Sequence, residues 1–481
     1  MDEICTQNQP AYISEQSVEN DQPACNVSAS QDNQSSESFP QLQTQPPASD
    51  VIRLPFSQNL IGKSVLLTVL TLISFGVVAV TSALVSVKVD PNTPWYALAS
   101  VKHMIFAAAA IVILAFTWRI DYRILAKGRI PYLALTLFLI SIALCLLVNI
   151  PYVQPVLGHQ IGGKYRWLKF GAYQFQPSEL LKISMIFFLG SWLTKLKDNN
   201  VRKFKTFLIA SFCILFSALL VIQYDMSSAA LIMLSGGIVM LIAGVRWQFI
   251  IGAGVLAGLA VGFYIYNDPM RMKRVEAMLD PFDSKNKSSY QIRQALVSIY
   301  SGDKTGVGLG KGVRKLGFVP EDSTDFIFAS IAEEWGLIGA YMLIFVFMWF
   351  MWSCKIVAKL SPDKFGSVVA GTIGATIGLQ VLMHICVNFA VLPPTGIGLP
   401  LISAGGTRLI MLALSISMVL SVSARRKSMD LVAKDDPELL ESKRDSNLSS
   451  DEEQNSDTMH EPQANIQNES ALRVSNLACE E

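Results

Sequence analysis

Long apolar runs dominate the middle of this chain and limit what it can fold into. Charged residues make up only 16% of the chain, against about 25% in ordinary soluble domains, so they could not cover a soluble surface of this size. An apolar run of about 20 residues is long enough to cross a bilayer as a helix. We therefore expect an all-α integral membrane protein with ten transmembrane helices, at about 64–87, 101–118, 131–149, 178–194, 206–223, 226–244, 247–267, 326–353, 366–391 and 401–423.

The loops between these runs carry unequal charge, which predicts the orientation. Basic residues crowd one set of alternate short loops, which the positive-inside rule assigns to the cytoplasm. Both termini are then expected in the cytoplasm. The loop 268–325, between helices seven and eight, is expected outside and is also basic. Long loops follow the rule weakly, and loops of this length are usually functional, so we expect this large extracytoplasmic loop to contribute to function. The other loops expected outside are 88–100, 150–177, 224–225 and 392–400.

The two ends of the chain lack apolar runs. Residues 1–58 are rich in Gln, Ser and Asn, and residues 428–481 are rich in Asp, Glu and Ser. Such compositions cannot bury enough apolar surface to fold. We expect both ends to be disordered acidic cytoplasmic tails around a membrane domain at 59–427. The seven cysteines form no C-x-x-C pair, which argues against a disulfide framework or a zinc site.

Polar residues that are costly in a membrane gather around the start of the fourth run. They are Arg166, Gln176, Ser178, Glu179 and Lys182. Glu179 and Lys182 are three residues apart, so they share a face of a helix and can pair. The pair either holds the top of the helix together or forms a charged site beside a polar substrate.

The loop 268–325 contains a polar, amphipathic stretch that carries Tyr290, Gln291 and Gln294. A charged and helical stretch, Asp268 to Arg274, precedes it. Tyr290, Gln291 and Gln294 are candidates for contact with a polar substrate.

The same loop ends in a glycine-rich stretch at 302–317. These glycines do not form a P-loop, because no G-K-[ST] follows them. The stretch is either a flexible connection or backbone that wraps around a phosphate or a sugar. Positive charge would then come from Lys311, Arg314 and Lys315.

Three carboxylates lie where the chain enters the eighth run. Asp325 stands at the membrane boundary beside Thr324, and Glu333 and Glu334 follow about two turns deeper. Ionisable groups within a span are functional candidates, and a carboxylate at the boundary suits a general base. Helix capping by Thr324 or Asp325 would explain one acid but not the two deeper ones.

The last outer loop, 393–408, combines prolines, glycines and small hydroxyl residues, among them Ser403 and Thr407. This composition predicts irregular backbone at membrane depth. Such backbone is tolerated only where it is buried in protein or lines a wet cavity.

In this order and spacing, the motifs resemble those of the SEDS family (shape, elongation, division and sporulation), the FtsW/RodA group of bacterial cell-wall polymerases. The resemblance covers about 60–425, and the stretch 272–282 is closer to the division type, FtsW, than to the elongation type, RodA. The motifs are R-W…Q-P-S-E-x-x-K (166–182), Y-Q-x-x-Q (290–294), G-x-G-x-G (306–310), P-E-x-x-T-D-F-I-F (320–328), A-E-E-x-G (332–336) and P-T-G-I-x-L-P (394–400).

The resemblance implies a peptidoglycan glycosyltransferase that polymerises lipid II, an undecaprenyl-pyrophosphate disaccharide-pentapeptide, at the outer face of the bacterial cytoplasmic membrane. Asp325 matches the family's essential aspartate and would act as general base. Lys311, Arg314 or a divalent cation such as magnesium would stabilise the leaving pyrophosphate. The implied partners are a class B penicillin-binding protein, which crosslinks the strand, and proteins of the divisome or elongation complex.

The same resemblance, together with the polar residues above, gives the expected substrate-binding set. It consists of Arg166, Gln176, Ser178, Glu179, Lys182, Tyr290, Gln291, Gln294, Lys311, Arg314, Thr324, Glu333, Glu334, Ser403 and Thr407.

Two turns depart from the family pattern. The family usually has S-Y-G-G-[ST]-S where this chain has S-A-G-G-T-R at 403–408, and Q-P-D-x-G-[ST] where it has Q-Y-D-M-S-S at 223–228. These changes bear on the shape of the turns and on partner contact more than on the chemistry. Three alternatives stay open: a flippase or transporter for the lipid-linked precursor, a scaffold for the crosslinking enzyme, and an elongation-type polymerase.

The net charge of +1 is an average over unlike parts. Residues 1–50 carry eight acids and no Lys or Arg, and residues 428–481 carry fourteen acids against four bases, so residues 51–427 carry +19. The average argues against a nucleic-acid binder. The excess of positive charge in the loop from Arg271 to Lys315 instead favours an anionic ligand at the outer face.

Overall fold

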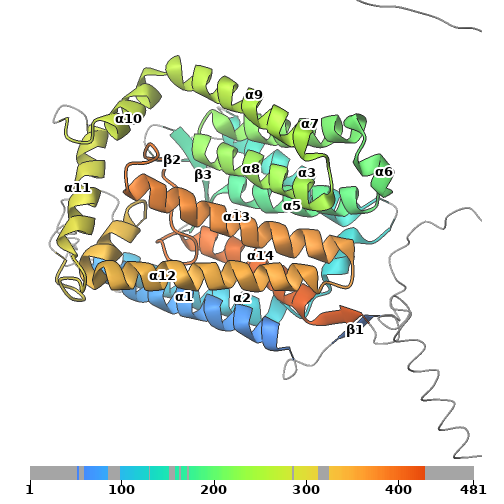
Figure 1. The fold of residues 1–481 in the computed structure, drawn as a ribbon, viewed down its shortest axis with the longest axis horizontal. Helices are drawn as coiled ribbons and strands as arrows, with labels where there is room; N and C mark the ends of the chain where they lie inside the picture. Colours follow the sequence, from blue (N-terminus) through green and yellow to red (C-terminus); the bar gives the residue numbers. More distant parts are fainter. Residues whose placement is uncertain are drawn as a thin grey trace, which may run out of the picture. The chain divides into compact units, whose positions relative to one another are not determined.

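The computed structural model describes residues 51–53, 59–84, 98–128, 130–150, 158–161, 164–170, 173–283, 287–312 and 324–427. These residues form a bundle of long helices that run side by side (Figure 1). Nine helices of this part are long and apolar enough to cross a membrane, and each matches a predicted run. They are α1 (Leu60–Leu84), α2 (Ala99–Thr117), α3 (Tyr132–Asn149), α7 (Phe204–Ile222), α8 (Met226–Ala243), α9 (Trp247–Tyr266), α12 (Ile327–Lys359), α13 (Lys364–Asn388) and α14 (Gly406–Ser423).

The fourth predicted run corresponds to α5 (Pro177–Thr194). Glu179 and Lys182 lower its mean hydropathy, so it is not among the nine apolar helices. Fourteen of the 18 residues of α5 are nevertheless buried, and the helix packs against α3, α8 and α13. The all-α membrane fold is thus confirmed, while the count of ten spans stays a prediction.

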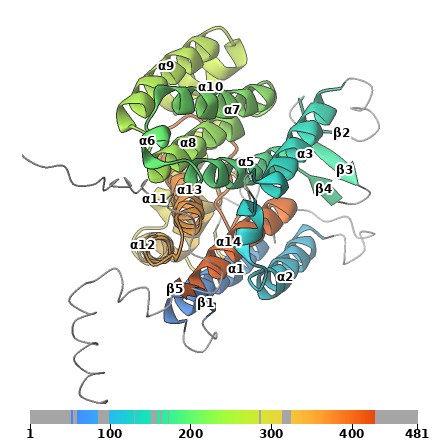
Figure 2. The same cartoon turned by 90° about the vertical axis from the view of Figure 1, so that its right-hand side faces the viewer.

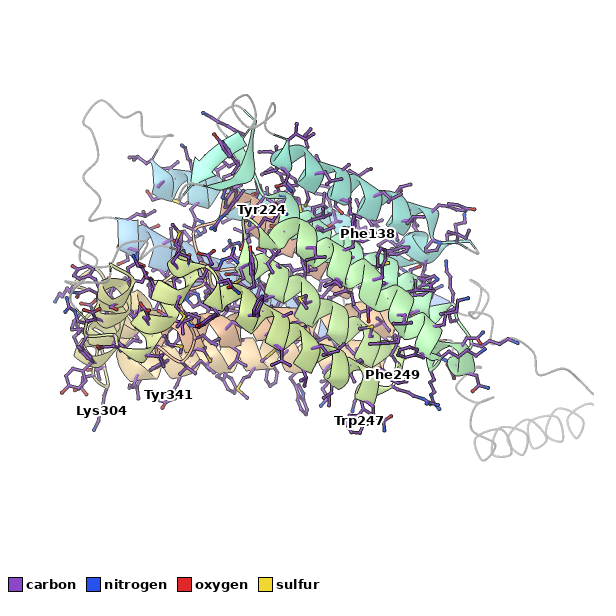
Figure 3. The ribbon with its side chains drawn as sticks, turned by 90° about the horizontal axis from the view of Figure 1, so that it is seen from above. Phe138, Tyr224, Trp247, Phe249, Lys304 and Tyr341 are labelled. Carbon is purple, nitrogen blue, oxygen red and sulfur yellow. The ribbon has the colours of Figure 1, made fainter. Side chains whose placement is uncertain are left out.

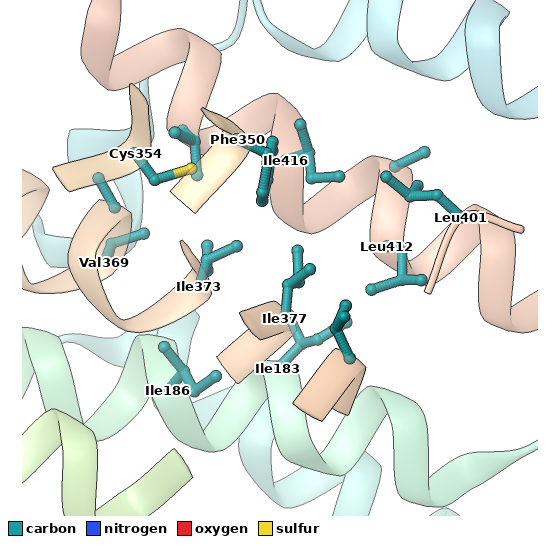
Figure 4. Close-up of a cluster of buried hydrophobic side chains, with 14 of the residues drawn as sticks. Ile183, Ile186, Phe350, Cys354, Val369, Ile373, Ile377, Leu401, Leu412 and Ile416 are labelled. Carbon is teal, nitrogen blue, oxygen red and sulfur yellow. The ribbon is translucent and has the colours of Figure 1, made fainter. Parts of the chain in front are cut away.

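Figure 4 shows part of the buried core of the bundle, to which apolar side chains of α5, α12, α13 and α14 contribute. Small residues allow these helices to approach closely, as expected where packing rather than water exclusion drives association. Gly374 of α13, for example, lies directly against Cys354 of α12. The buried cluster includes Ile183 and Ile186 of α5, Phe350 of α12, Val369, Ile373 and Ile377 of α13, and Leu412 and Ile416 of α14.

Helix α9 differs from the others because none of its residues is buried. Figure 3 shows Trp247 and Phe249 at one end of this helix, far from Lys304. A helix this apolar without protein cover suits contact with lipid tails.

Two helices occupy much of the predicted outer loop: α10 (Pro269–Leu279) and α11 (Lys287–Ser301). Asp268 caps α10 by accepting hydrogen bonds from the backbone N–H of Met270 at 3.0 Å and of Arg271 at 3.4 Å, and Pro269 takes the first helical position, where it is favoured. The helical stretch predicted at Asp268 to Arg274 is confirmed. We call the end of the bundle that carries α10 and α11 the cavity end.

A small antiparallel sheet lies near α3 at the cavity end (Figure 2). Its strands are β2 (Gly158–Ile161), β3 (Lys164–Phe170) and β4 (Tyr173–Phe175), in the order β2-β3-β4. This sheet was not predicted from the sequence. Strand β3 carries Arg166, and β4 leads directly into α5.

A two-stranded ribbon lies at the opposite end of the bundle, where α1 begins and α14 ends. Strand β1 (Val51–Arg53) pairs antiparallel with β5 (Arg425–Lys427). Residues 51–53 were expected in a disordered tail, and this expectation is wrong because they pair regularly with β5. Close by, the short helix η4 (Tyr122–Ala126) is tied to α13, because the Tyr122 hydroxyl donates a hydrogen bond to Asp363. Another short helix, α6 (Asp198–Val201), connects α5 to α7.

Helix α12 is broken at Gly336, whose φ of 67° and ψ of −168° are non-helical. The break frees backbone groups, which must find partners inside a membrane protein. The loop after α11 supplies them: Val307 N–H donates to the Glu333 carbonyl at 3.0 Å, and Gly308 N–H to that of Glu334 at 3.1 Å. In return, Leu337 N–H donates to the Asp303 carbonyl at 2.9 Å. The glycine-rich stretch is therefore docked on the break in α12.

The segment between α13 and α14 turns back into the bundle. Ala390 and Leu401 have positive φ angles of 58° and 64°, and Leu401 and Ile402 are buried against Gly76 of α1. The expectation that the last span begins at 401 is corrected here: α14 begins at Gly406, because 401–405 form the turn. This irregular, buried backbone agrees with the composition of the loop.

Candidate functional site

A cavity of about 470 Å³ lies at the cavity end. Strand β3, α10, α11, the start of α12, the segment 389–405 and the first turn of α14 contribute to its wall. Half of the ten Arg, Asp, Gln, Ser and Thr side chains on the wall are charged. The ten are Arg166, Gln176, Asp225, Arg274, Ser288, Gln291, Thr324, Asp325, Thr395 and Arg408.

Asp325 lines this cavity immediately before α12 begins. The residue is half-buried, whereas Phe326 after it is buried. Gly396 lies beside the carboxylate with a φ of 74°, and a Cβ atom on it would be 3.6 Å from Asp325 Oδ2. Asp325 is thus held at the boundary between the apolar bundle and the cavity, where a carboxylate can accept a proton from a bound hydroxyl.

Two arginines from the segments outside the long helices line the same cavity. Arg166 comes from β3, and Arg274 comes from α10, where its Nη1 donates a hydrogen bond to the Pro394 carbonyl at 3.1 Å. Burial lowers the pKa of Arg274, and the neighbouring Arg166 lowers it further, while Asp325 opposes this shift. Arginine stays protonated in proteins despite such shifts, so both remain positive beside Asp325.

Asp225 joins α5 to α8 at the wall of the cavity. Gln176 Nε2 donates a hydrogen bond to Asp225 Oδ2 at 3.0 Å. The same carboxylate caps α8 by accepting from the Ser228 backbone N–H at 3.0 Å and the Ser228 hydroxyl at 2.7 Å. The turn at 223–228, which departs from the family pattern, is therefore closed by an ordinary helix cap. Ser227 also donates to the Thr395 carbonyl.

Glu179 and Lys182 form the pair that their spacing predicts. Lys182 Nζ lies 2.8 Å from Glu179 Oε2, and both side chains are only 6% exposed. A second cation, Arg408, places its Nε 3.6 Å from the other carboxylate oxygen, Oε1. One buried carboxylate thus serves two cations, of which Arg408 also lines the cavity.

Replacing Glu179 by Gln is expected to destabilise the protein strongly, because Lys182 and Arg408 would lose their counter-ion inside the bundle. Breaking a buried pair costs about 3–5 kcal/mol. Lys364→Met is the matched control, since its pair with Asp198, at 2.9 Å, is 61% and 68% exposed and is worth about 1 kcal/mol or less. Thermal unfolding of the detergent-solubilised protein measures both. Equal shifts in the two variants would contradict the buried role of Glu179.

Ser403 and Thr324 hold the loop that returns to the bundle. The Ser403 hydroxyl donates to the Thr324 carbonyl at 2.8 Å and accepts from the Leu399 backbone N–H at 2.6 Å. Ser403 therefore connects the returning loop to the segment before α12, while Thr324 lines the cavity. The hydroxyls of Ser178 and Thr407 are buried and have no hydrogen-bond partner within the described residues.

The predicted residues of α11 are divided between two environments. Gln291 lines the cavity. Gln294 is buried, and the Tyr290 ring lies 5.5 Å from the guanidinium carbon of Arg293. Of these three expected substrate-binding residues, the structure brings only Gln291 to the cavity wall.

Lys311, Glu333 and Glu334 do not line the cavity. Glu334 is buried and accepts a hydrogen bond from the Ser82 hydroxyl, 2.7 Å from Oε1, and Lys311 is exposed. The idea that the glycine-rich stretch wraps around a phosphate is not supported in its described part, because the N–H groups of Val307 and Gly308 are used on α12. Arg314 and Lys315 lie outside the described residues.

Three charged lining residues were absent from the expected set: Asp225, Arg274 and Arg408. Arg274 stood in the basic stretch of the outer loop, and the other two stood in the turns that depart from the family pattern. The basic charge of the outer loop could have identified Arg274, and the departures from the family pattern could have identified Asp225 and Arg408. Over the described part of the chain, no group of three or more His, Cys, Asp and Glu side chains could hold a metal ion.

The fold and the site define a class: a multi-pass membrane protein with an arginine-rich cavity and a carboxylate at one end of its bundle. The particular family follows from comparison. A family model described as "Cell cycle protein", for FtsW, RodA and SpoVE, matches residues 63–428. The chain belongs to this family.

Named relatives agree with this membership. The chain is 33% identical over 329 residues to "Probable peptidoglycan glycosyltransferase FtsW" of Geobacter sp. (strain M18), covering 68% of this chain and 87% of the relative. It is 30% identical over 324 residues to "Stage V sporulation protein E" of Bacillus subtilis (strain 168), covering 67% and 86%.

Solved structures share the fold. A chain from "Structural coordination of polymerization and crosslinking by a peptidoglycan synthase complex" aligns with a TM-score of 0.61 at 23% identity, covering 75% of this chain and 96% of that one. The rod shape determining protein RodA of Thermus thermophilus aligns with a TM-score of 0.54 at 22% identity, covering 75% and 95%.

Proposed function

We propose that this chain is a peptidoglycan glycosyltransferase of the division type, which polymerises lipid II into glycan strands. The observation that carries the proposal is the position of Asp325, half-buried in a cavity that also holds three arginines. The names of its relatives support the activity. Such a site suits a reaction in which a proton is taken from a hydroxyl and an anionic group departs.

In the proposed reaction, the 4-hydroxyl of the acceptor sugar gives its proton to the Asp325 carboxylate. The hydroxyl oxygen attacks the anomeric carbon of the donor and forms the new glycosidic bond. The bond from that carbon to the pyrophosphate oxygen breaks, and the pyrophosphate leaves with the electron pair. Arg166 and Arg274 would stabilise the charge on this group. Lys311, to which the resemblance also gave this role, is exposed and is not on the cavity wall, whereas Arg314 lies outside the described residues and its role stays a prediction.

A divalent cation such as magnesium is a further part of the proposal. Magnesium in proteins is usually held by one or two carboxylates together with substrate phosphates. The Asp225 carboxylate on the cavity wall already accepts hydrogen bonds from Gln176 and Ser228, so Asp325 together with the substrate phosphates would hold the ion, and it would add positive charge beside the pyrophosphate.

We also propose that the cavity end faces outward, that both termini are cytoplasmic, and that the chain acts with a class B penicillin-binding protein. Similarity to a chain of a peptidoglycan synthase complex supports such a partner. The basic loops at the opposite end of the bundle, near Arg425, support the orientation. Divisome proteins would be further partners, and localisation at midcell rather than along the lateral wall would separate division from elongation.

The test is polymerisation by purified protein. Full-length chain, with its partner and lipid II, is expected to yield glycan strands that are resolved on a gel. A flippase is the alternative, because many spans and a polar cavity would suit it as well. Translocation of lipid II in vesicles that persists in Asp325→Asn, without any glycan product, would favour the flippase and contradict the proposal.

A further inference from the structure

Arg408 stands where the family usually has a serine, and the structure places it in the first turn of α14 on the cavity wall. Its ion pair with Glu179, at 3.6 Å, is longer than a hydrogen bond. The Arg408 Nε atom is buried and has no hydrogen-bond partner among the described residues. A buried donor without an acceptor is costly, so the ion pair with Glu179 leaves Arg408 able to donate a hydrogen bond to a further partner.

Glu179 does not need Arg408 as a counter-ion. Lys182 already neutralises this carboxylate at 2.8 Å through its other oxygen. The three charged groups together carry a net charge of +1 in a buried position beside the cavity. A buried excess charge is unfavourable unless it is paired, and an anion in the cavity would provide the pairing.

The rest of the cavity wall favours an anion over a neutral ligand. Arg166 and Arg274 line it as well, so three arginines face two aspartates there. One of these aspartates, Asp225, already accepts hydrogen bonds from Gln176 and Ser228. The planar guanidinium group matches the oxygens of a phosphate in a two-pronged contact.

We propose that Arg408 is an anion-binding residue that binds a phosphate group of the lipid-linked substrate. The proposal rests on the proposed function, and it adds a contact from α14 to those of Arg166 on β3 and Arg274 on α10. Arg408 acts on substrate affinity, whereas Asp325 acts on the chemical step.

Steady-state polymerisation kinetics with lipid II test the proposal. Arg408→Ser is expected to raise KM about tenfold or more, the effect of losing a charge-assisted hydrogen bond, with kcat changed less than about twofold. Arg408→Lys keeps the positive charge but loses the two-pronged contact of the guanidinium group. Its KM is expected to lie between the KM of Arg408→Ser and that of the unchanged protein. The control is Arg202→Ser, which is expected to leave KM unchanged. Arg202 is an exposed arginine in the connection between α6 and α7.

Inhibition by inorganic pyrophosphate gives a second readout on the same proteins. Arg408→Ser should need about tenfold more pyrophosphate for half inhibition than the unchanged chain. An unchanged KM and an unchanged inhibition would overturn the proposal, as would a fall in kcat alone, which would place Arg408 with Glu179 as a positioning residue. If Arg408→Ser does not accumulate, Arg408→Lys decides by the same criteria.

Failure of this inference and failure of the proposed function give different results. If the unchanged protein makes no glycan from lipid II, the proposed function itself is wrong. If it makes glycan, Asp325→Asn abolishes the product and Arg408→Ser leaves both readouts as they were, only the assignment of Arg408 is wrong.

Discussion

Asp325→Asn is expected to reduce glycan polymerisation to about 1% or less of the unchanged rate, with the protein present at its normal level. Asparagine has nearly the same shape but cannot take a proton, and general base catalysis contributes about 100-fold to 10,000-fold. Asp325 lies at the entrance to α12 on the cavity wall, so the substitution leaves the bundle intact. The measurement is the initial rate of glycan formation from lipid II by purified protein with its partner.

Asp225→Asn is the matched control, because it is the same chemical change at a carboxylate on the same cavity wall. Asparagine caps a helix about as well as aspartate, so α8 should keep its start, and most of the activity should remain. A normal rate in Asp325→Asn would show that Asp325 is not the base. Equal losses in both variants would show that the cavity needs negative charge in general rather than a base at Asp325.

Gly306→Ala is expected to prevent the docking of the glycine-rich stretch on α12, with loss of folded protein. Gly306 has a φ of 78°, and a Cβ atom there would overlap the carbonyl of Glu334. Next to Gly306, the N–H groups of Val307 and Gly308 donate the hydrogen bonds that hold the stretch on α12. Losing these two hydrogen bonds would cost about 2 kcal/mol, in addition to the strain of a side chain at positive φ.

Gly310→Ala separates the backbone strain from the overlap. Gly310 has nearly the same φ, 77°, but no atom lies within 4 Å of the position of its Cβ. Its replacement should cost only the strain of a left-handed residue, about 1–2 kcal/mol. The melting temperature in detergent and the yield of folded protein measure both variants. Equal destabilisation by the two substitutions would contradict the docking of this stretch on the break in α12.

Much of the bundle was predictable because the apolar runs have the length that the bilayer requires. The described helices begin and end within a few residues of the predicted runs, apart from α12, which continues to Lys359, and α14, which begins at Gly406. Charge at the start of α5 did not hide the helix, since the pair of Glu179 and Lys182 also follows helical spacing.

The remaining features depend on contacts between distant segments. The ribbon joins Val51–Arg53 to Arg425–Lys427, and nothing in either short segment alone predicts this pairing. Likewise, the glycine-rich stretch was open to a phosphate-binding interpretation, because its sequence does not reveal that Gly336 breaks α12 and exposes carbonyl groups to it.

The candidate site was predictable in part for the same reason. Asp325 and Arg166 were found from polar residues near the membrane boundary, and Gln291 was found from the polar stretch of the outer loop. The structure brings all three to one cavity. Arg274 and Arg408 join them only because α10 and α14 meet the same space. The sequence pattern identified the charged residues but not which of them lie together at the cavity.

The most direct test of the account uses proteoliposomes in which the cavity end of the protein faces outward, with lipid II added to the outside only. The account predicts that glycan strands form on that side without any movement of lipid II across the bilayer. Product that appears only when lipid II is supplied from the inside, or translocation without polymerisation, would contradict an outward-facing polymerase site at Asp325.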